Sequence, residues 1–381
     1  MDSTTVLETV RDETFDEFVA RAGDWLAQTV PDRWRRQRGS LTPAESDQIR
    51  RDWDIALYKG GFAGISLPAE YGGLGLGLAE EIAFSVLAGK AQAPDGFGRV
   101  AKVLVAPMLI ADGTADQRAR YLRPTIAGET VWCQGFSEPE AGSDLAGVKT
   151  RAVKVDGGWE ISGRKTWTSF AQHADHCFLL AQTDPDAPRY RNLGMFLVSM
   201  NQPGVTVHDI KQISGAVHFA EVHFDRAFVP DADLVGEPGQ GWKIAMNVLQ
   251  HERGGSETAA RYVEIRADID LLLSSCADRP ELQNEIRELD IRTELLRWQL
   301  SKVVDLEAAG GEAFERAVSI LKVLWSELWQ DVTRLGVSAM VPKDRDHWRY
   351  QYFESRAVSI YSGTNEIQRN IVAERVLGLP R

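Results

Sequence analysis

The spacing of apolar residues divides the chain into three regions. Over residues 1–125, apolar side chains such as Phe15, Phe18 and Val19 recur about every 3.6 positions, the period of a helix that is buried on one side. Residues 126–235 instead carry short β-branched or aromatic runs at intervals of roughly ten residues, separated by turns. The first region is therefore predicted to be helical, and the second to form a small β-barrel or sandwich.

Residues 236–381 return to a helical pattern. Long helices are expected at about 242–274, 280–308, 312–337 and 350–376. The third has an apolar stripe that comprises Ala317, Ile320, Leu321, Leu324, Leu328 and Val332. Such helices, joined by short connections, favour a four-helix bundle. The predicted fold is α+β and mostly α, with a helical domain at 1–125, a β-barrel-like domain at 126–235 and the bundle at 236–381.

Local signals mark where some of these elements begin. Thr42 with Glu45, and Thr114 with Gln117, have the spacing of capping boxes, so a helix is expected to start after each threonine. Asp156-Gly157-Gly158 is a hairpin signal within the β-rich region.

Length and charge narrow the class of protein. A chain of 381 residues is long enough for two or three domains, and a net charge of −12 argues against a nucleic-acid binder. The three cysteines are odd in number and widely separated, which indicates neither a disulfide framework nor a zinc site. An acidic start without a signal pattern, and no run of about 18 apolar residues, predict a cytoplasmic protein that does not enter a membrane.

Two short polar segments beside apolar runs are expected to form ligand-binding loops. They are QGFSEPEAGSD, residues 134–144, and KTWTS, residues 165–169. Such loops offer backbone N–H groups and small hydroxyls to a ligand that needs many hydrogen bonds on a flat face. By themselves they indicate only that something polar is held there.

The order of these motifs resembles the acyl-CoA dehydrogenase flavoprotein family. The resemblance extends from GFAGISLPAEYGGLGL near the start to YSGTNEIQRNIVAERVLGLP at the end. It implies three domains in the order helical, β and helical, with FAD as the cofactor. It also implies α,β-desaturation of an acyl-CoA thioester, with electrons leaving to an electron-transfer flavoprotein.

The resemblance implies roles for the first polar segment. Gln134 belongs to the loop that meets the pyrimidine side of the FAD ring. Phe136 and Ser137 would meet the ring edge, while Gly142 and Ser143 would approach the flavin phosphates and the acyl-CoA. The alternative is that the serines only cap turns.

In the second segment, the resemblance implies that Trp167 stacks on the flavin ring and that Thr168 and Ser169 bond its N5 side. A flavin ring has hydrogen-bonding edges and apolar faces, so an aromatic floor suits it. The alternative is that Trp167 is a core residue.

The family's catalytic base is commonly the glutamate of a Tyr-Glu-Gly-Thr motif, and this chain departs from that pattern. The corresponding residues are Tyr361, Ser362, Gly363 and Thr364, of which the first three would contact the substrate. A serine hydroxyl without an activator cannot remove the weakly acidic α-proton of a thioester. The base must therefore lie elsewhere.

Some family members place the glutamate on an earlier helix, before an arginine, where this chain has Glu252 and Arg253. Glu252 is the predicted base, and Arg253 would hold or neutralise nearby carboxylates; the alternative is a solvated helix pair. Gly254 and Gly255 follow, and glycine inside a helix costs about 1 kcal/mol relative to alanine, which a bulky ligand close to the helix would explain. Together with Ser362 they predict a roomy cavity for a bulky, branched or ring-bearing acyl group.

Two motifs that homomeric members use to complete a neighbour's FAD site are missing. Arg279 is followed by proline rather than by the pattern Arg-x-x-Phe-Gly, and residues 330–340 hold one glycine where the family has three. The resemblance therefore points to the heteromeric branch, which includes enzymes of bacterial steroid and sterol side-chain degradation. Thr364 and Glu366 lie where the family contacts the adenosine end of FAD, although Glu366 could instead cap or pair.

Three other interpretations remain open from the sequence. Unrecognised residues could rebuild the site in a homo-oligomer. The chain could be a scaffold whose partner performs the chemistry, or an oxidase or monooxygenase variant of the same fold.

Overall fold

The computed structural model describes residues 13–37, 41–252, 255–307, 311–339 and 341–380. The chain forms two compact units, each built from segments that are distant in the sequence. One unit comprises Met1–Gly77, Ala93–Gln212 and Ala216–Glu252, and the other comprises Leu78–Gln92, Ile213–Gly215 and Arg253–Arg381. No helix among the described residues is long and apolar enough to cross a bilayer.

The helices of the first unit are α2 (Phe15–Thr29), α3 (Asp32–Gln37), α4 (Pro43–Lys59), α6 (Ala106–Asp112), α7 (Ala115–Ile126) and α8 (Gly241–Glu252). Two of them, α4 and α7, begin where the capping signals predicted. The Thr42 side chain accepts from the Glu45 N–H while Glu45 bonds back to the cap, and Thr114 and Gln117 do the same before α7. Both capping boxes are therefore confirmed.

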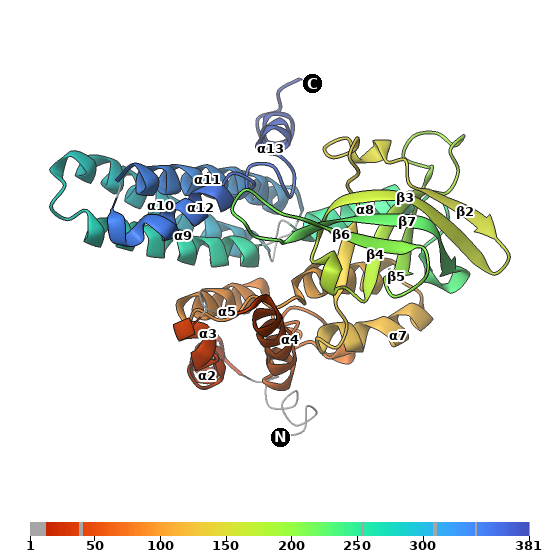
Figure 1. Cartoon of the computed structure of the whole chain (residues 1–381), viewed down its shortest axis with the longest axis horizontal. Coiled ribbons are helices and arrows are strands. Elements are labelled where there is room, and N and C mark those ends of the chain that lie inside the picture. The colour runs from red at the N-terminus through yellow and green to blue at the C-terminus, as the bar shows by residue number, and fades with distance from the viewer. Residues whose placement is uncertain (1–12, 38–40, 253–254, 308–310, 340, 381) are drawn as a thin grey trace. The chain divides into compact units, whose positions relative to one another are not determined.

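The β-rich region folds into one eight-stranded sheet, in which all seven predicted runs are strands (Figure 1). The strands are β1 (Trp132–Gly135), β2 (Arg151–Val155), β3 (Gly158–Ser169), β4 (His176–Gln182), β5 (Leu193–Ser199), β6 (Val205–Ile210), β7 (Phe219–Pro230) and β8 (Leu234–Val235). The order across the sheet is β6-β7-β3-β2-β4-β5-β8, and β1 pairs with β4. The predicted hairpin is confirmed, because Val155 of β2 pairs with Gly158 of β3 across the Asp156-Gly157 turn.

One expectation for this sheet was wrong: residues 165–169 are the end of strand β3 rather than a loop. The strand continues because it pairs with β7, where Lys165 lies opposite Val222 and Ser169 opposite Phe219. A register shift between Lys165 and Thr168 interrupts the pairing and gives the segment its irregular shape.

The second unit is a helical bundle. It contains α5 (Leu78–Lys90), α9 (Gly255–Ser275), α10 (Pro280–Glu307), α11 (Gly311–Ala339), α12 (Arg345–Glu354) and α13 (Asn365–Ile371), and the helices α9, α10 and α11 lie side by side in Figure 1. The α11 stripe packs inward at Ala317, Leu321, Leu328 and Val332, whereas Leu324 is exposed.

One helix boundary differs from the prediction. The helix expected at 350–376 is interrupted, because Ser362 and Gly363 adopt positive φ angles of 52° and 81°, which a right-handed helix cannot contain. A loop therefore separates α12 from α13. Of the helix expected at 242–274, the structure describes α8, which packs on β5 in the first unit, and α9, which belongs to the bundle.

A buried carboxylate ties α12 to α9 and makes the stability of the bundle dependent on pH. The His347 Nε2 atom lies 2.8 Å from Oδ1 of the buried Asp268, and this hydrogen bond raises the pKa of His347 against the opposing effect of burial. A raised pKa in the folded state stabilises the fold below the unfolded histidine pKa of about 6.5, and the stabilisation is lost as pH rises through the folded value.

We therefore expect His347→Gln to lower the free energy of unfolding more at pH 5.5 than at pH 8.5. The difference should not exceed about 1 kcal/mol, since 42% of the His347 side chain is exposed and solvent screens the pair. Urea unfolding of both proteins across this pH range measures it. An equal loss at both pH values would contradict a charged His347–Asp268 pair.

Candidate active site

The two polar segments are joined in the first unit, as their predicted common role requires. The Thr166 N–H donates to the Ser137 carbonyl at 3.0 Å. The neighbouring residue, Lys165, adds two more bonds: its ammonium donates to the Phe136 carbonyl at 3.0 Å and to Oε1 of Glu138 at 2.8 Å. One lysine thus links the end of β3 to the loop that follows β1.

Glu138 continues this network to the start of β2. Its carboxylate accepts from the Thr150 N–H at 2.9 Å and from the Lys149 N–H at 2.6 Å. Burial alone would raise the pKa of Glu138, but the charge of Lys165 and these hydrogen bonds outweigh it and hold the pKa below the ordinary value. The Lys165 side chain is 0% exposed, and burial lowers its pKa while Glu138 offsets part of that effect.

Reasoning from the sequence missed both Glu138 and Lys165 as determinants of the site. The burial of Lys165 is visible only in the structure. There it signals a partner, because a charge is rarely buried unless it is paired. Nothing in the sequence identified its partner.

Trp167 lies on the surface in a strained conformation. It has a φ angle of 57°, which is costly for a bulky residue, and 58% of its area is exposed. Its ring approaches Phe219 edge-on, with ring centroids 6.0 Å apart. The alternative that Trp167 is a core residue is therefore wrong. Ser169 is half-buried, and Thr168 is fully buried with a hydroxyl that finds no hydrogen-bond partner among the described residues.

The loop that follows β1 exposes two small residues, while its aromatic side chain is buried. Phe136 is buried against Phe178, Gln134 and Ser137 are half-buried, and Gly142 and Ser143 are exposed. A Cβ atom added to Gly142 would meet nothing within 4 Å, so packing within this chain does not require glycine there. Space at Gly142 is what the approach of an external ligand to the backbone would need.

The residues Tyr361–Thr364 lie in the second unit, in the loop between α12 and α13, and all four are half-buried. Thr364 is the N-cap of α13, where its Oγ1 accepts from the Ile367 N–H at 3.2 Å. The exposed Glu366 bonds to its own backbone N–H and to Thr364, and these bonds lower its pKa. The cap of α13 is thus Thr364, and contact of either residue with FAD stays a prediction.

Of the predicted catalytic pair, only the backbone of Glu252 is described. Glu252 is the last residue of α8, and Arg253 lies outside the described residues together with Gly254. Gly255 is the first described residue of α9, so the expectation that Gly254 and Gly255 lie inside a helix falls outside the described residues and stays a prediction.

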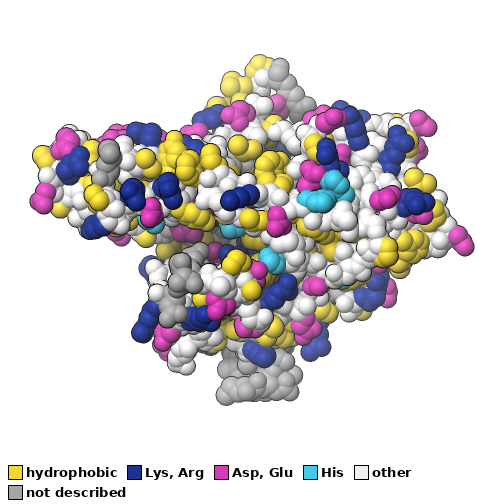
Figure 2. All heavy atoms as spheres, viewed as in Figure 1, with side chains coloured by type: hydrophobic (Ala, Val, Ile, Leu, Met, Phe, Trp, Pro, Cys, Tyr) yellow, Lys and Arg dark blue, Asp and Glu magenta, His cyan; other side chains and the backbone are white. Residues whose placement is uncertain are grey.

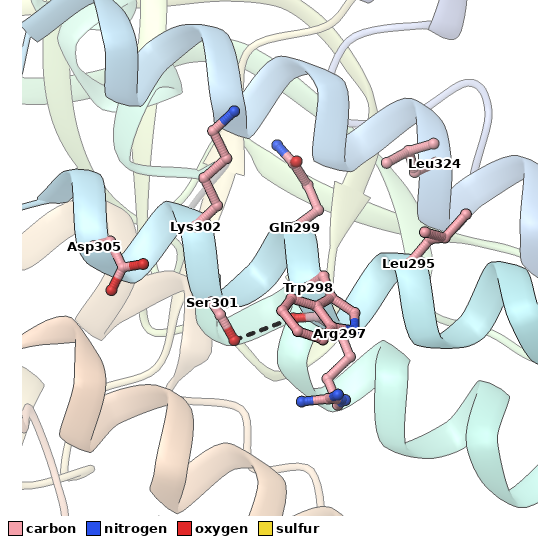
Figure 3. A pocket seen from close by; sticks show the side chains of 8 residues that line it. All are labelled: Leu295, Arg297, Trp298, Gln299, Ser301, Lys302, Asp305 and Leu324. Atoms are coloured by element: carbon pink, nitrogen blue, oxygen red, sulfur yellow. Dashed lines mark hydrogen bonds between the residues drawn. The ribbon is translucent and has the colours of Figure 1, made fainter.

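The surface of the bundle has a hollow of its own. Figure 3 shows that Leu295, Trp298 and Lys302 of α10 line it together with Leu324 of α11. None of its lining residues belongs to the predicted site. Its rim is unusually apolar, because Ile291, Leu295 and Trp298 follow one face of α10 and more than half of each is exposed.

Comparisons with known proteins agree with this architecture. Three family models match in sequence: the N-terminal domain of acyl-CoA dehydrogenase at residues 12–129, its middle domain at 133–227 and its C-terminal domain at 239–377. Acyl-CoA dehydrogenase IpdE1 of Mycobacterium tuberculosis is 38% identical, with 96% of this chain and 98% of that protein covered.

Two solved structures share the fold at 25% identity. The ChsE4–ChsE5 complex from Mycobacterium tuberculosis has a TM-score of 0.82, with 97% of this chain and 99% of that chain covered. A variant of the Tcur3481–Tcur3483 steroid ACAD has a TM-score of 0.83, with 96% and 99% covered. The family models span most of the sequence, and the chain therefore belongs to the acyl-CoA dehydrogenase family, oxidoreductases that act on the CH–CH bond of acyl-CoA.

Proposed function

We propose that this protein carries out FAD-dependent α,β-dehydrogenation of a bulky or ring-bearing acyl-CoA, as one chain type of a heteromer. The observation that carries the proposal is Trp167, whose exposed indole is held at a positive φ angle. Strain of this kind persists only where the surrounding structure maintains it, and it concentrates at ligand sites. The hydrogen bonds of Lys165 to Phe136 and Glu138 hold the neighbouring loop in place.

The described residues of the first unit fit a flavin. Trp167 offers an accessible aromatic face, the Phe136–Ser137 backbone lies beside it through the Thr166–Ser137 bond, and Gly142 with Ser143 leave room for phosphates. Thr168 and Ser169 remain the candidates for the N5 side, and the buried Thr168 hydroxyl, which has no hydrogen-bond partner among the described residues, would gain one there. Bound FAD would supply the hydride acceptor for the β-hydrogen of the substrate.

Glu252 is the base in this proposal. A carboxylate can remove the α-proton of a thioester when it is partly desolvated and its pKa moves toward neutrality. Arg253 would limit the rise in the pKa of Glu252 and keep its carboxylate ionised. Ser362, small and unable to act as the base, would leave space beside the acyl chain, which is the basis for expecting a bulky substrate.

Arg279 supports the heteromer. In homomeric members the arginine motif at this place completes a neighbour's FAD site, whereas Arg279 makes contacts within its own chain. It pairs with Glu281, and its Nη1 donates to the Ala339 carbonyl at 3.3 Å near the end of α11. The apolar surface around Trp298 also fits a chain that does not act alone. Both solved structures named above carry paired chain names, and one is called a steroid ACAD. Electrons would pass to an electron-transfer flavoprotein in the cytoplasm.

The flavin-to-chain ratio tests the proposal. The protein purified alone should hold little FAD, and a complex with the related chain encoded beside it should hold about one FAD per pair of chains. Trp167→Ala in that complex should release flavin, while Tyr350→Ala should not, although both remove an exposed aromatic side chain. One tightly held FAD per chain without a partner would overturn the heteromer.

A further inference from the structure

A buried polar network lies beneath the loop that connects α12 to α13. Its members on α11 are Lys322, Ser326 and Gln330, and Lys322 and Ser326 are almost completely buried. Buried polar side chains are costly unless each finds a partner. Here the partners belong to the segment from Ser355 to Asn365, which contains Tyr361, Ser362 and Gly363.

Lys322 joins the two ends of that loop. Its ammonium donates to the Val358 carbonyl at 2.7 Å, before the loop, and to Oδ1 of Asn365 at 2.9 Å, after it. Asn365 also accepts from the Ser326 hydroxyl at 3.0 Å and is itself buried. One cation therefore holds two points that are seven residues apart, and each contact is charge-assisted.

The backbone between these points is closed by its own bonds. The Asn365 N–H donates to the Ser359 carbonyl at 2.9 Å, and the Gln330 side chain donates to Ser359 Oγ at 3.1 Å. The Gln368 side chain donates to the Ser362 carbonyl at 3.3 Å. Within this frame Ser362 and Gly363 hold two consecutive positive φ angles, and serine adopts such an angle only when its surroundings impose it.

We propose that Lys322 is a positioning residue that holds the Tyr361–Gly363 loop in one shape and thereby sets which acyl groups the enzyme accepts. The proposal rests on the function proposed above, in which this loop contacts the substrate. A rigid loop keeps its cavity open for a bulky acyl group, and a loop freed at both ends collapses or fluctuates. Lys322 acts through the loop and not on the reacting atoms.

The test is Lys322→Met, which keeps the length of the side chain but removes the ammonium. Hydrogen–deuterium exchange should speed up by about tenfold or more at the Tyr361 and Asn365 amides, whose acceptors are the Ala357 and Ser359 carbonyls. In the flavin-loaded complex, KM for a bulky acyl-CoA should rise by about tenfold while kcat changes less than about twofold. Lys343→Met, an exposed lysine of the same unit, should change neither quantity.

Unchanged exchange at these two amides would overturn the proposal, as would faster exchange with an unchanged KM. If Lys322→Met does not fold, Asn365→Ala removes the shared acceptor and must give the same pattern. Exchange needs neither flavin nor substrate, so it distinguishes failure of this proposal from failure of the proposed function. A complex that is inactive on every acyl-CoA but shows the predicted exchange would contradict the function alone.

Discussion

Replacing Lys165 by methionine is expected to lower the free energy of unfolding by about 3–5 kcal/mol, because it leaves the carboxylate of Glu138 buried without its cation. The Phe136 carbonyl loses its donor in the same step. Urea unfolding of the purified chain measures the loss. We also expect the variant complex to hold less FAD, since Lys165 connects the two segments that the flavin would contact.

Lys149→Met is the matched control for this change. Lys149 lies in the same network region, but its ammonium pairs with Glu140 at the surface, where ion pairs contribute little. Its backbone N–H, which donates to Glu138, is unaffected by the substitution. Similar losses in the free energy of unfolding for the two variants would show that the buried Lys165–Glu138 pair stabilises the fold no more than a surface pair does.

Replacing Glu252 by glutamine in the flavin-loaded complex is expected to lower kcat by about 10²–10⁴-fold, the usual contribution of a general base. Glutamine has nearly the shape of glutamate but cannot take the α-proton. FAD content and the affinity for acyl-CoA should therefore remain close to those of the unaltered complex. Steady-state kinetics, with the flavin spectrum recorded on the same samples, measure both.

The control for Glu252→Gln is Glu264→Gln on α9, a half-exposed glutamate that pairs with Arg261. It should leave kcat unchanged. If Glu252→Gln retained full activity, the base would lie elsewhere or on the partner chain. The scaffold interpretation of this chain would then gain support.

The sequence predicted the elements of the fold more reliably than their ends. Strands, capping boxes and the Asp156-Gly157 hairpin depend on a few neighbouring residues, so a local pattern suffices to find them. The long helix expected across Ser362 was interrupted, because an apolar period in the sequence continues through a break that the surrounding chain imposes.

For the candidate site too, the sequence predicted some features correctly and missed others. The first segment is a loop beyond Gly135, the last residue of β1, and the structure joins it to the second through Thr166 and Ser137, but the second is the end of a strand. The exposure of Trp167 could not be read from its neighbours, since an aromatic residue among threonines suits a buried strand equally well.

The sequence by itself determined the order of helical and β-rich regions and the family to which the chain belongs, because periodicity and motif order are properties of neighbouring residues. Only the tertiary structure decided that Lys165 meets Glu138, 27 positions away, and that Lys322 meets Asn365, 43 positions away. A buried charge is tolerated only when folding brings a partner to it. Such pairs therefore become visible only once distant segments are placed together.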